Sequence, residues 1–212
     1  MDLSRAFDLR SRLTIPARFQ VETAYHGAGQ NEWDRACSIG EEWVQTFSRD
    51  VIARINLGSC LRYLGRHNEA LVQFRDAARL LPSIPTFTNL SIEAICAQKF
   101  DEAKEAYDDA ISHRLDSPGL HYDHTLLAFL QNDKTEMQKE WAWASQDRVR
   151  GRYVLSMESK AEGFFGHSRN ADRLTRIDAE SSMKAGLSSD AADFENIAAL
   201  RDAENGNAEE AQ

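Results

Sequence analysis

The sequence contains few of the residues that break helices or favour strands. Of its 212 residues, 4 are proline and 11 are glycine. Valine, isoleucine and threonine together number 24, against 28 alanines. Because β-branched residues favour strands and alanine is the best helix former, this balance argues against a sandwich or barrel and predicts an all-α chain.

Cysteine is also scarce. The three cysteines are Cys37, Cys60 and Cys96, and none of them forms a Cys-x-x-Cys pair. An odd and sparse set of this kind does not fit a disulfide framework or a structural zinc site. The sequence therefore predicts three reduced, buried thiols.

Long apolar runs and an excess of basic charge are missing as well. The longest stretch without a charged residue, 80–92, has 13 residues and two prolines, too few to span a bilayer. Residues 1–5 lack the start of a secretory signal. The net charge of 25 − 34 = −9 disfavours nucleic acid as a partner. We expect a soluble, cytoplasmic protein without direct membrane insertion; the alternative is an extracytoplasmic part of a larger membrane-attached protein.

The sequence does contain a repeat with a period of 33 or 34 residues. Its clearest copy has Ala70, Phe74 and Ala77 at spacings of four and three. The same columns hold Ala36, Gly40 and Trp43; Ala103, Tyr107 and Ala110; Met137, Trp141 and Ala144; and, in the last copy, Ala171 alone. In the clearest copy these residues share one helical face, so the repeat predicts a buried helix–helix contact.

Two amphipathic stretches in each period predict an antiparallel helical hairpin. We expect hairpins at 16–48, 51–82, 85–115, 118–148 and 150–186, and a further first helix near 189–205. The chain then divides into a partial helix or linker at 1–15, the hairpins at 16–186, and a C-terminal helix with a truncated or capping end at 187–212. Caps or early-turn prolines are expected for first helices at Thr14-Ile-Pro16, Asp50, Ser83-Ile-Pro85, Ser117-Pro118 and Ser188-Ser-Asp190. For second helices, the expected caps are Asn68, Asp101, Asp133 and Ser168.

The best copy has a recognisable resemblance. Its residues Leu57-Gly58, Leu61, Gly65, Ala70, Phe74, Ala77 and Pro82 resemble a tetratricopeptide repeat (TPR). The resemblance covers about residues 16–186. It implies a right-handed α-solenoid of about five antiparallel helix-turn-helix repeats plus a C-terminal helix. It also implies a protein or peptide partner in a concave groove lined by the first helices, without naming that partner.

A second resemblance concerns particular segments. Trp43–Asp50, Asn56–Gly58, Leu115–Pro118, Ala128–Asp133 and Trp141–Ala144 are similar to TPR regions attached to bacterial Ser/Thr protein kinases. The motifs of the kinase itself are missing from the sequence. The chain begins within an amphipathic stretch and stops at Asn207–Gln212, where a further helix is due. We therefore expect a fragment of a longer protein; the alternative is that both ends are solubilising caps.

Two histidines are the best candidates for chemistry. His121 and His124 lie three residues apart, a spacing that can seat a metal on one helix face. Both occupy columns that pack the hairpin, and no third ligand is evident, so we expect core histidines. The sequence also lacks a nucleophile elbow. It therefore predicts no metal, no cofactor and no enzymatic activity.

The first helices carry the candidate binding residues. They are Asn56, Ser59 and Tyr63 in the second hairpin, Asn89 and Ile92 in the third, and Tyr122, Asp123, Leu126 and Phe129 in the fourth. This face is mainly apolar and aromatic, with Arg62 as its single arginine. It therefore suits a helix or an extended apolar segment better than a pair of carboxylates. The alternative is that these side chains only pack between hairpins.

Two asparagines repeat within this face. Asn56 and Asn89 occupy the same column, which also contains Glu22 and Asp123. The arrangement resembles the asparagine ladders that hold extended peptides, and the alternative is that each asparagine only ties its hairpin to the next.

We expect a protein–protein interaction scaffold. The alternative is a sensory or regulatory domain that controls an attached catalytic domain, such as a Ser/Thr kinase, through self-association.

Overall fold

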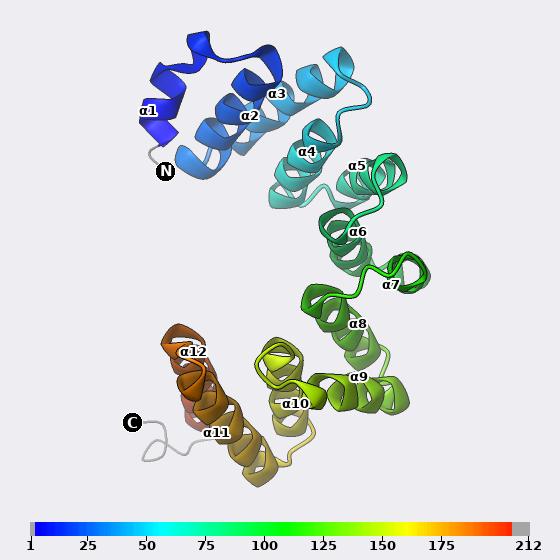
Figure 1. Ribbon diagram of the computed structural model, residues 1–212, viewed down its shortest axis with the longest axis vertical. Coiled ribbons are helices and arrows are strands. Elements are labelled where there is room, and N and C mark those ends of the chain that lie inside the picture. The colour runs from blue at the N-terminus through cyan, green and yellow to red at the C-terminus, as the bar shows by residue number, and fades with distance from the viewer. Residues whose placement is uncertain (1–2, 205–212) are drawn as a thin grey trace. The chain divides into compact units, whose positions relative to one another are not determined.

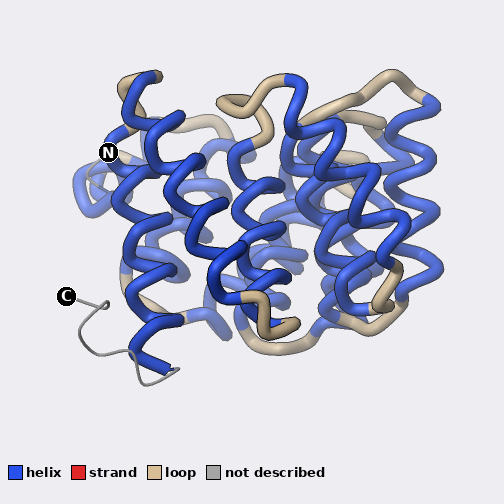
Figure 2. Tube along the Cα trace, turned by 90° about the horizontal axis from the view of Figure 1, so that it is seen from below, coloured by secondary structure: helices blue, strands red, loops and turns tan. Residues whose placement is uncertain are grey.

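The computed structural model describes residues 3–204, and every regular element within that range is helical (Figure 2). The predicted all-α helical-repeat fold is confirmed. The chain divides after Asp116 into two compact units, which are described separately. The predicted truncated or capping end at Asn207–Gln212 lies outside the described residues. Within them, no helix is long and apolar enough to cross a membrane.

The first unit contains an N-terminal segment followed by three helical hairpins (Figure 1). The N-terminal segment consists of α1 (Leu3–Asp8) and the short 3-10 helix η1 (Arg10–Arg12). The hairpins pair α2 (Ile15–Ala24) with α3 (Trp33–Thr46), α4 (Val51–Tyr63) with α5 (His67–Leu80), and α6 (Ile84–Cys96) with α7 (Phe100–Ser112). A π-helical turn, η2 (Tyr25–Gly29), extends α2.

The second unit contains two hairpins and a last helix. The hairpins pair α8 (Pro118–Leu130) with α9 (Lys134–Gln146), and α10 (Arg152–Phe164) with α11 (Ser168–Lys184); α12 (Ser188–Glu204) follows. The even-numbered helices α2 to α10 are therefore the first helices of the hairpins, and the odd-numbered helices α3 to α11 are the second. The proposed division at 1–15, 16–186 and 187–212 stays a prediction.

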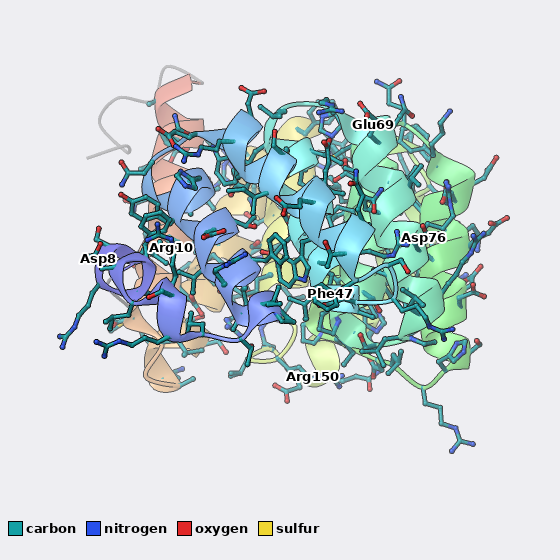
Figure 3. All side chains as sticks on the ribbon, turned by 90° about the horizontal axis from the view of Figure 1, so that it is seen from above. Asp8, Arg10, Phe47, Glu69, Asp76 and Arg150 are labelled. Atoms are coloured by element: carbon teal, nitrogen blue, oxygen red, sulfur yellow. A yellow bond between two sulfur atoms is a disulfide. The ribbon has the colours of Figure 1, made fainter. Side chains whose placement is uncertain are left out.

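Aromatic stacking and an arginine–glutamate ion pair hold the N-terminal segment against the first hairpin. Phe7 of α1 stacks on Tyr25, with ring centroids 4.0 Å apart. Arg10, labelled in Figure 3, donates from Nε to a carboxylate oxygen of Glu22 at 3.2 Å. Glu22 belongs to the column of Asn56 and Asn89, so at this position the column serves internal packing.

The repeating small residues lie where the two helices of a hairpin meet. Ala36, Ala70, Ala103 and Ala171 have no exposed surface, and Met137 is 1% exposed. Phe74 of the best repeat is fully buried, and a Cβ on Gly58 would lie 2.8 Å from its ring. Gly58 therefore allows α4 to approach the Phe74 ring of α5 closely.

The turn inside each hairpin also repeats. Five residues before the small residue, the backbone has a positive φ: 59° at Asn31, 73° at Gly65, 58° at Gln98, 54° at Asn132 and 85° at Gly166. Glycine adopts this left-handed conformation freely, and asparagine tolerates it better than most residues. The turn geometry is thus kept even where glycine is not.

The fifth hairpin replaces the aromatic packing with polar contacts. Thr175 occupies the aromatic column, and its hydroxyl lies 2.6 Å from that of Ser159 on α10. Asp178 replaces the second small residue and accepts a hydrogen bond from Nη2 of Arg148 at 2.5 Å. Burial raises the pKa of Asp178, and Arg148 offsets part of that rise. This hairpin therefore keeps the fold with a different interior.

Four of the predicted caps are confirmed. Asp50, Ser83, Ser117 and Asp133 each precede a helix and accept hydrogen bonds from its first turn or form its capping box. Thr14 precedes α2, which has the expected early proline, but makes no side-chain cap hydrogen bond, and Ser188 is the first residue of α12. Three caps of second helices were placed wrongly. Asn68 and Asp101 lie inside helices that begin at His67 and Phe100, and Ser168 is the first residue of α11. The positive-φ turn starts these second helices without a side-chain cap.

The prediction of three reduced, buried thiols is wrong. Cys37 of α3 and Cys60 of α4 form a disulfide, with Cα atoms 5.5 Å apart, and Cys96 is exposed. The sequence separation of 23 residues gave no indication of this pair, because the contact forms between two hairpins. The disulfide therefore ties the first hairpin to the second.

Replacing the ring at the best hairpin contact should destabilise the fold. Phe74→Ala leaves a cavity that costs about 3–5 kcal/mol. Ala70→Leu forces extra methylenes into the contact and costs about 1–3 kcal/mol. Urea unfolding measures both. The control Val72→Ser, on the exposed side of α5, should stay within about 0.5 kcal/mol; equal effects for all three variants would contradict the packing described.

The disulfide should be visible in thiol counts and in stability. Two of the three cysteines are bonded, so unfolded and unreduced protein should react with one equivalent of a thiol reagent, at Cys96. Cys60→Ser should lower the free energy of unfolding by about 3 kcal/mol, given the 23-residue separation. The Cys96→Ser control should keep its stability under the same conditions. Three reactive thiols in unreduced protein would instead restore the sequence-based prediction.

Candidate functional site

The candidate residues of the first unit lie on α4 and α6. Asn56, Ser59 and Tyr63 follow one another along one face of α4, and Asn89 and Ile92 lie on α6. Tyr63 is 67% exposed, and the other four are partly exposed. The first-helix surface of this unit therefore presents one large ring beside two amides, a hydroxyl and an aliphatic side chain.

Each asparagine uses part of its amide on its own helix. Nδ2 of Asn56 donates to the Ile52 carbonyl at 2.8 Å, and Nδ2 of Asn89 donates to the Pro85 carbonyl at 3.0 Å. Arg62 approaches Oδ1 of Asn89 at 3.4 Å. An amide has two donor hydrogens and an acceptor oxygen, so these contacts leave hydrogen-bonding capacity on both side chains.

A second ring supports Tyr63. Trp33, the first residue of α3, stacks on Tyr63 with ring centroids 3.9 Å apart and planes 11° from parallel. The Trp33 indole N–H donates to Oδ1 of Asn31 at 2.7 Å, which fixes the orientation of the indole. Trp33 could not be identified from the repeat pattern, because it lies outside the aromatic column.

Arg62 is occupied within the protein. Its guanidinium pairs with Glu93, whose side chain is fully buried, and lies 4.6 Å from the ring centroid of Phe74. Nδ1 of His67 also lies 2.9 Å from the Glu93 carboxylate. This buried carboxylate joins the second hairpin to the third. Arg62 therefore stabilises the fold. The single arginine of the first-helix face is not available to bind a carboxylate of a partner.

The candidate residues of the second unit differ in exposure. Tyr122, Leu126 and Phe129 are partly exposed along α8, whereas Asp123 is 4% exposed. Asp123 thus lies in the interior and does not form part of the surface predicted for it. The reason is that α8 turns this column toward its neighbours instead of toward solvent.

Tyr122 is held by the core of the second unit. Its ring packs, with Trp141 and Trp143, against the buried residues Ala144 and Val154. Burial raises the pKa of Tyr122, and the nearby charge of Asp123 raises it further. Tyr122 therefore fits both interpretations of the first-helix face: part of its ring packs between hairpins, and part remains accessible to a partner.

The two histidines are buried and share one carboxylate. Nδ1 of His121 lies 2.5 Å from one oxygen of Glu140, and Nδ1 of His124 lies 2.9 Å from the other. A carboxylate only accepts hydrogen bonds, so each imidazole places a proton on Nδ1. The His121 ring also stacks on Trp143 at 3.6 Å. The prediction of core histidines is confirmed. Glu140 could not be identified as their partner from the sequence, because it lies on the next helix.

This cluster has a specific electrostatic balance. Burial alone would raise the pKa of Glu140, but hydrogen bonds from His121 and His124 outweigh it and lower the pKa to about 2. Within residues 3–204, no three His, Cys, Asp or Glu side chains are arranged to hold a metal ion. The two hydrogen bonds to Glu140 join α8 to α9.

A pocket of about 450 Å³ lies on the other side of the first unit. It is bordered by Arg75 and Arg79 of α5 and by Glu105 of α7, above the buried Phe87 and Leu90 of α6. Two hydrogen bonds of 2.8 and 2.9 Å from Arg75 to Glu102 cross it. The sequence predicted no site here, since the pocket lies between second helices.

The lowered pKa of Glu140 makes a pH-dependent contribution to stability. Because the folded-state pKa lies below the ordinary 4.5, the contribution is complete above about pH 4.5 and is lost as the pH falls toward 2. Glu140→Gln should therefore cost about 3 kcal/mol at pH 7 and much less at pH 3. Urea unfolding at both pH values tests this. The exposed control Glu69→Gln should show a small difference at either pH, and a constant cost for Glu140→Gln would contradict the assignment.

Comparison with known proteins gives no family by sequence. No family model matches the chain, and no curated protein matches it. Solved structures do match it at the level of fold. Cut9, from the crystal structure of an APC/C hetero-tetramer Cut9–Hcn1, aligns with a TM-score of 0.67 and 14% identity over 99% of this chain. The chain spans 41% of the Cut9 chain.

Two shorter proteins align along most of their length. PilW, described as a widely conserved type IV pilus biogenesis factor, has a TM-score of 0.56 and 14% identity, covering 99% of this chain and 96% of its own. MamA has a TM-score of 0.53 and 14% identity, covering 92% and 95%. All three are TPR proteins. At these identities the similarity concerns the fold, and the chain has the fold of a TPR α-solenoid.

Proposed function

We propose that the protein is a non-enzymatic interaction scaffold that binds a peptide or protein segment on the surfaces of its first helices. The observation that supports this most is the exposed ring of Tyr63, held in place by its stack on Trp33. A large aromatic side chain that is exposed and already ordered loses little freedom on binding, which favours its use as an anchor.

In the first unit, the surface combines that anchor with backbone-binding groups. The amides of Asn56 and Asn89 and the hydroxyl of Ser59 can hydrogen-bond a peptide backbone, while Ile92 adds an apolar contact. Arg62 is paired with the buried Glu93, so little free positive charge contributes. The surface therefore suits an apolar segment held by neutral hydrogen bonds.

In the second unit, the proposed contacts lie on α8. Leu126 and Phe129 are partly exposed, and Tyr122 contributes the part of its ring that the core leaves open. Asp123 is left out of the proposal because it is buried.

The kinase-related alternative, control of an attached catalytic domain, is supported by sequence similarity alone. Examining the gene on both sides of this chain for a kinase domain tests that alternative.

The disulfide supports a location for the protein. Disulfides persist mainly in oxidising compartments and are rare in the cytosol of mesophiles. The Cys37–Cys60 bond therefore favours the extracytoplasmic alternative over the cytoplasmic one. Alkylating the protein in intact cells before lysis should leave both cysteines unmodified if this proposal is correct.

Substitutions on the first helices should weaken peptide binding. Peptides selected from a displayed random library on the wild-type protein would be titrated by calorimetry. For a peptide bound to the first unit, Tyr63→Ala should cost about 2 kcal/mol or more, as buried aromatic anchors do. Asn89→Ala should cost about 0.5–1.5 kcal/mol, the value of one neutral hydrogen bond.

The controls for this titration use other surfaces. Val72→Ala, on the second helix α5, should leave the affinity unchanged, and Leu126→Ala probes the second unit in the same way as Tyr63→Ala probes the first. Selected peptides whose affinity survives both Tyr63→Ala and Leu126→Ala, in variants that remain folded, would move binding to the second helices and end this proposal.

A further inference from the structure

The second unit has an exposed cluster of phenylalanines at the ends of two first helices. Phe164, the last residue of α10, is 75% exposed, the highest value among the large hydrophobic side chains of the described residues. Its ring centroid lies 5.2 Å from that of Phe129 on α8 and 5.5 Å from that of Phe165. With Leu130, which is 50% exposed, these residues form what we call the phenylalanine patch.

The position of the patch follows from the repeat. The last residues of α4, α6, α8 and α10 are Tyr63, Cys96, Leu130 and Phe164, spaced by 33 or 34 residues, and all four are exposed. This column therefore faces solvent in every hairpin in which it occurs. In the fifth hairpin the residue at this column position is Phe164. Phe164 is therefore exposed because of its position in the repeat, as its equivalents in the other hairpins are.

Two lysines flank the patch. Nζ of Lys134 lies 5.4 Å from the ring centroid of Phe165, and Lys160 lies one helical turn before Phe164 on α10. Neither lysine forms an ion pair with any described residue. Lys104 and Lys139 elsewhere in the chain do so, at 2.9 and 2.7 Å. In sequence, the acidic residues nearest to these lysines are Asp133, beside Lys134, and Glu158 and Glu162, two residues before and after Lys160. Asp133 caps α9 by accepting from the Glu136 N–H at 3.0 Å.

The setting of Lys160 adds a separate observation. The side chain is only partly exposed, and burial lowers its pKa. A cation that is partly removed from water without a counter-charge is unfavourable, and an incoming carboxylate would relieve that cost. The site is therefore complementary to negative charge, although the whole chain carries a net charge of −9.

We propose that the phenylalanine patch binds an acidic amphipathic peptide segment, whose apolar side chains pack on Phe164 and Phe129 while its Asp or Glu side chains reach Lys160 and Lys134. This inference rests on the proposed function, because α8 and α10 are first helices, and it adds the chemistry of the partner. Apolar residues at i, i+3, i+4 and i+7 of a helical segment would form the required face.

The test compares two synthetic peptides of equal length by fluorescence anisotropy. Both carry leucine and phenylalanine at i, i+3, i+4 and i+7; one has glutamate and the other lysine at the remaining positions. The acidic peptide should bind at least about tenfold more tightly than the basic one. Phe164→Ser should weaken the acidic peptide about tenfold, with little risk to folding because the ring is mainly exposed.

Matched variants separate the two contributions. Lys134→Gln combined with Lys160→Gln should reduce the preference for the acidic peptide to about twofold or less while leaving the apolar contact in place. Met183→Ser, which removes a 57% exposed side chain from the second helix α11, should change neither affinity. Circular dichroism would show that each variant is folded.

Several results would overturn the inference. They are equal or tighter binding of the basic peptide, no binding of the acidic peptide, and unchanged binding by Phe164→Ser. Vesicles containing an anionic lipid provide the competing outcome, because a patch that bound them through Phe164 in place of the peptide would be a membrane contact. A separate outcome is that the acidic peptide fails to bind while Tyr63→Ala or Leu126→Ala still weakens the binding of library peptides. In that case only this inference is withdrawn, and the proposed scaffold function stands.

Discussion

Close approach of neighbouring helices is the constraint on which the rest of this fold depends. A single hairpin leaves its apolar face in water, so neighbouring hairpins must stack to cover it. Close approach requires small residues at fixed positions, both within a hairpin, as at Gly58, and between hairpins, as at Gly151. A Cβ on Gly58 would lie 2.8 Å from the Phe74 ring, and one on Gly151 would lie 2.6 Å from Ala144. These contacts fix the register in which every other side chain is placed.

That constraint explains why the fold could be predicted from the sequence. The spacing of Ala70, Phe74 and Ala77 is local, and it recurs because each hairpin solves the same packing problem. The fifth hairpin shows the limit of this reasoning. There Thr175 and Asp178 keep the backbone arrangement through hydrogen bonds to Ser159 and Arg148. A pattern of apolar residues could not indicate that substitution, since the partners come from α10 and from the turn that precedes it.

The same reasoning explains what the sequence missed at the candidate site. Tyr63 and Phe129 were named because they lie on the first helices that the resemblance places along a groove. Trp33 and Phe164 were missed because their roles depend on contacts with rings distant in the chain. The buried carboxylates Glu93 and Glu140 were not distinguished from solvated ones either. Their burial depends on cations and imidazoles supplied by another helix, and charged residues are rarely buried unless they are paired in this way. The residues of the binding surface themselves remain a proposal.

The disulfide has a consequence for how the chain would respond to force. In a stacked array, each hairpin contacts only its neighbours, so pulling on the ends would release hairpins one at a time. Cys37 and Cys60 join the second helix of the first hairpin to the first helix of the second across 23 residues. While the bond is intact, about 80 Å of extended chain cannot be released between them. Reduction would make that length available, so the oxidation state sets how far this end of the array can extend under load.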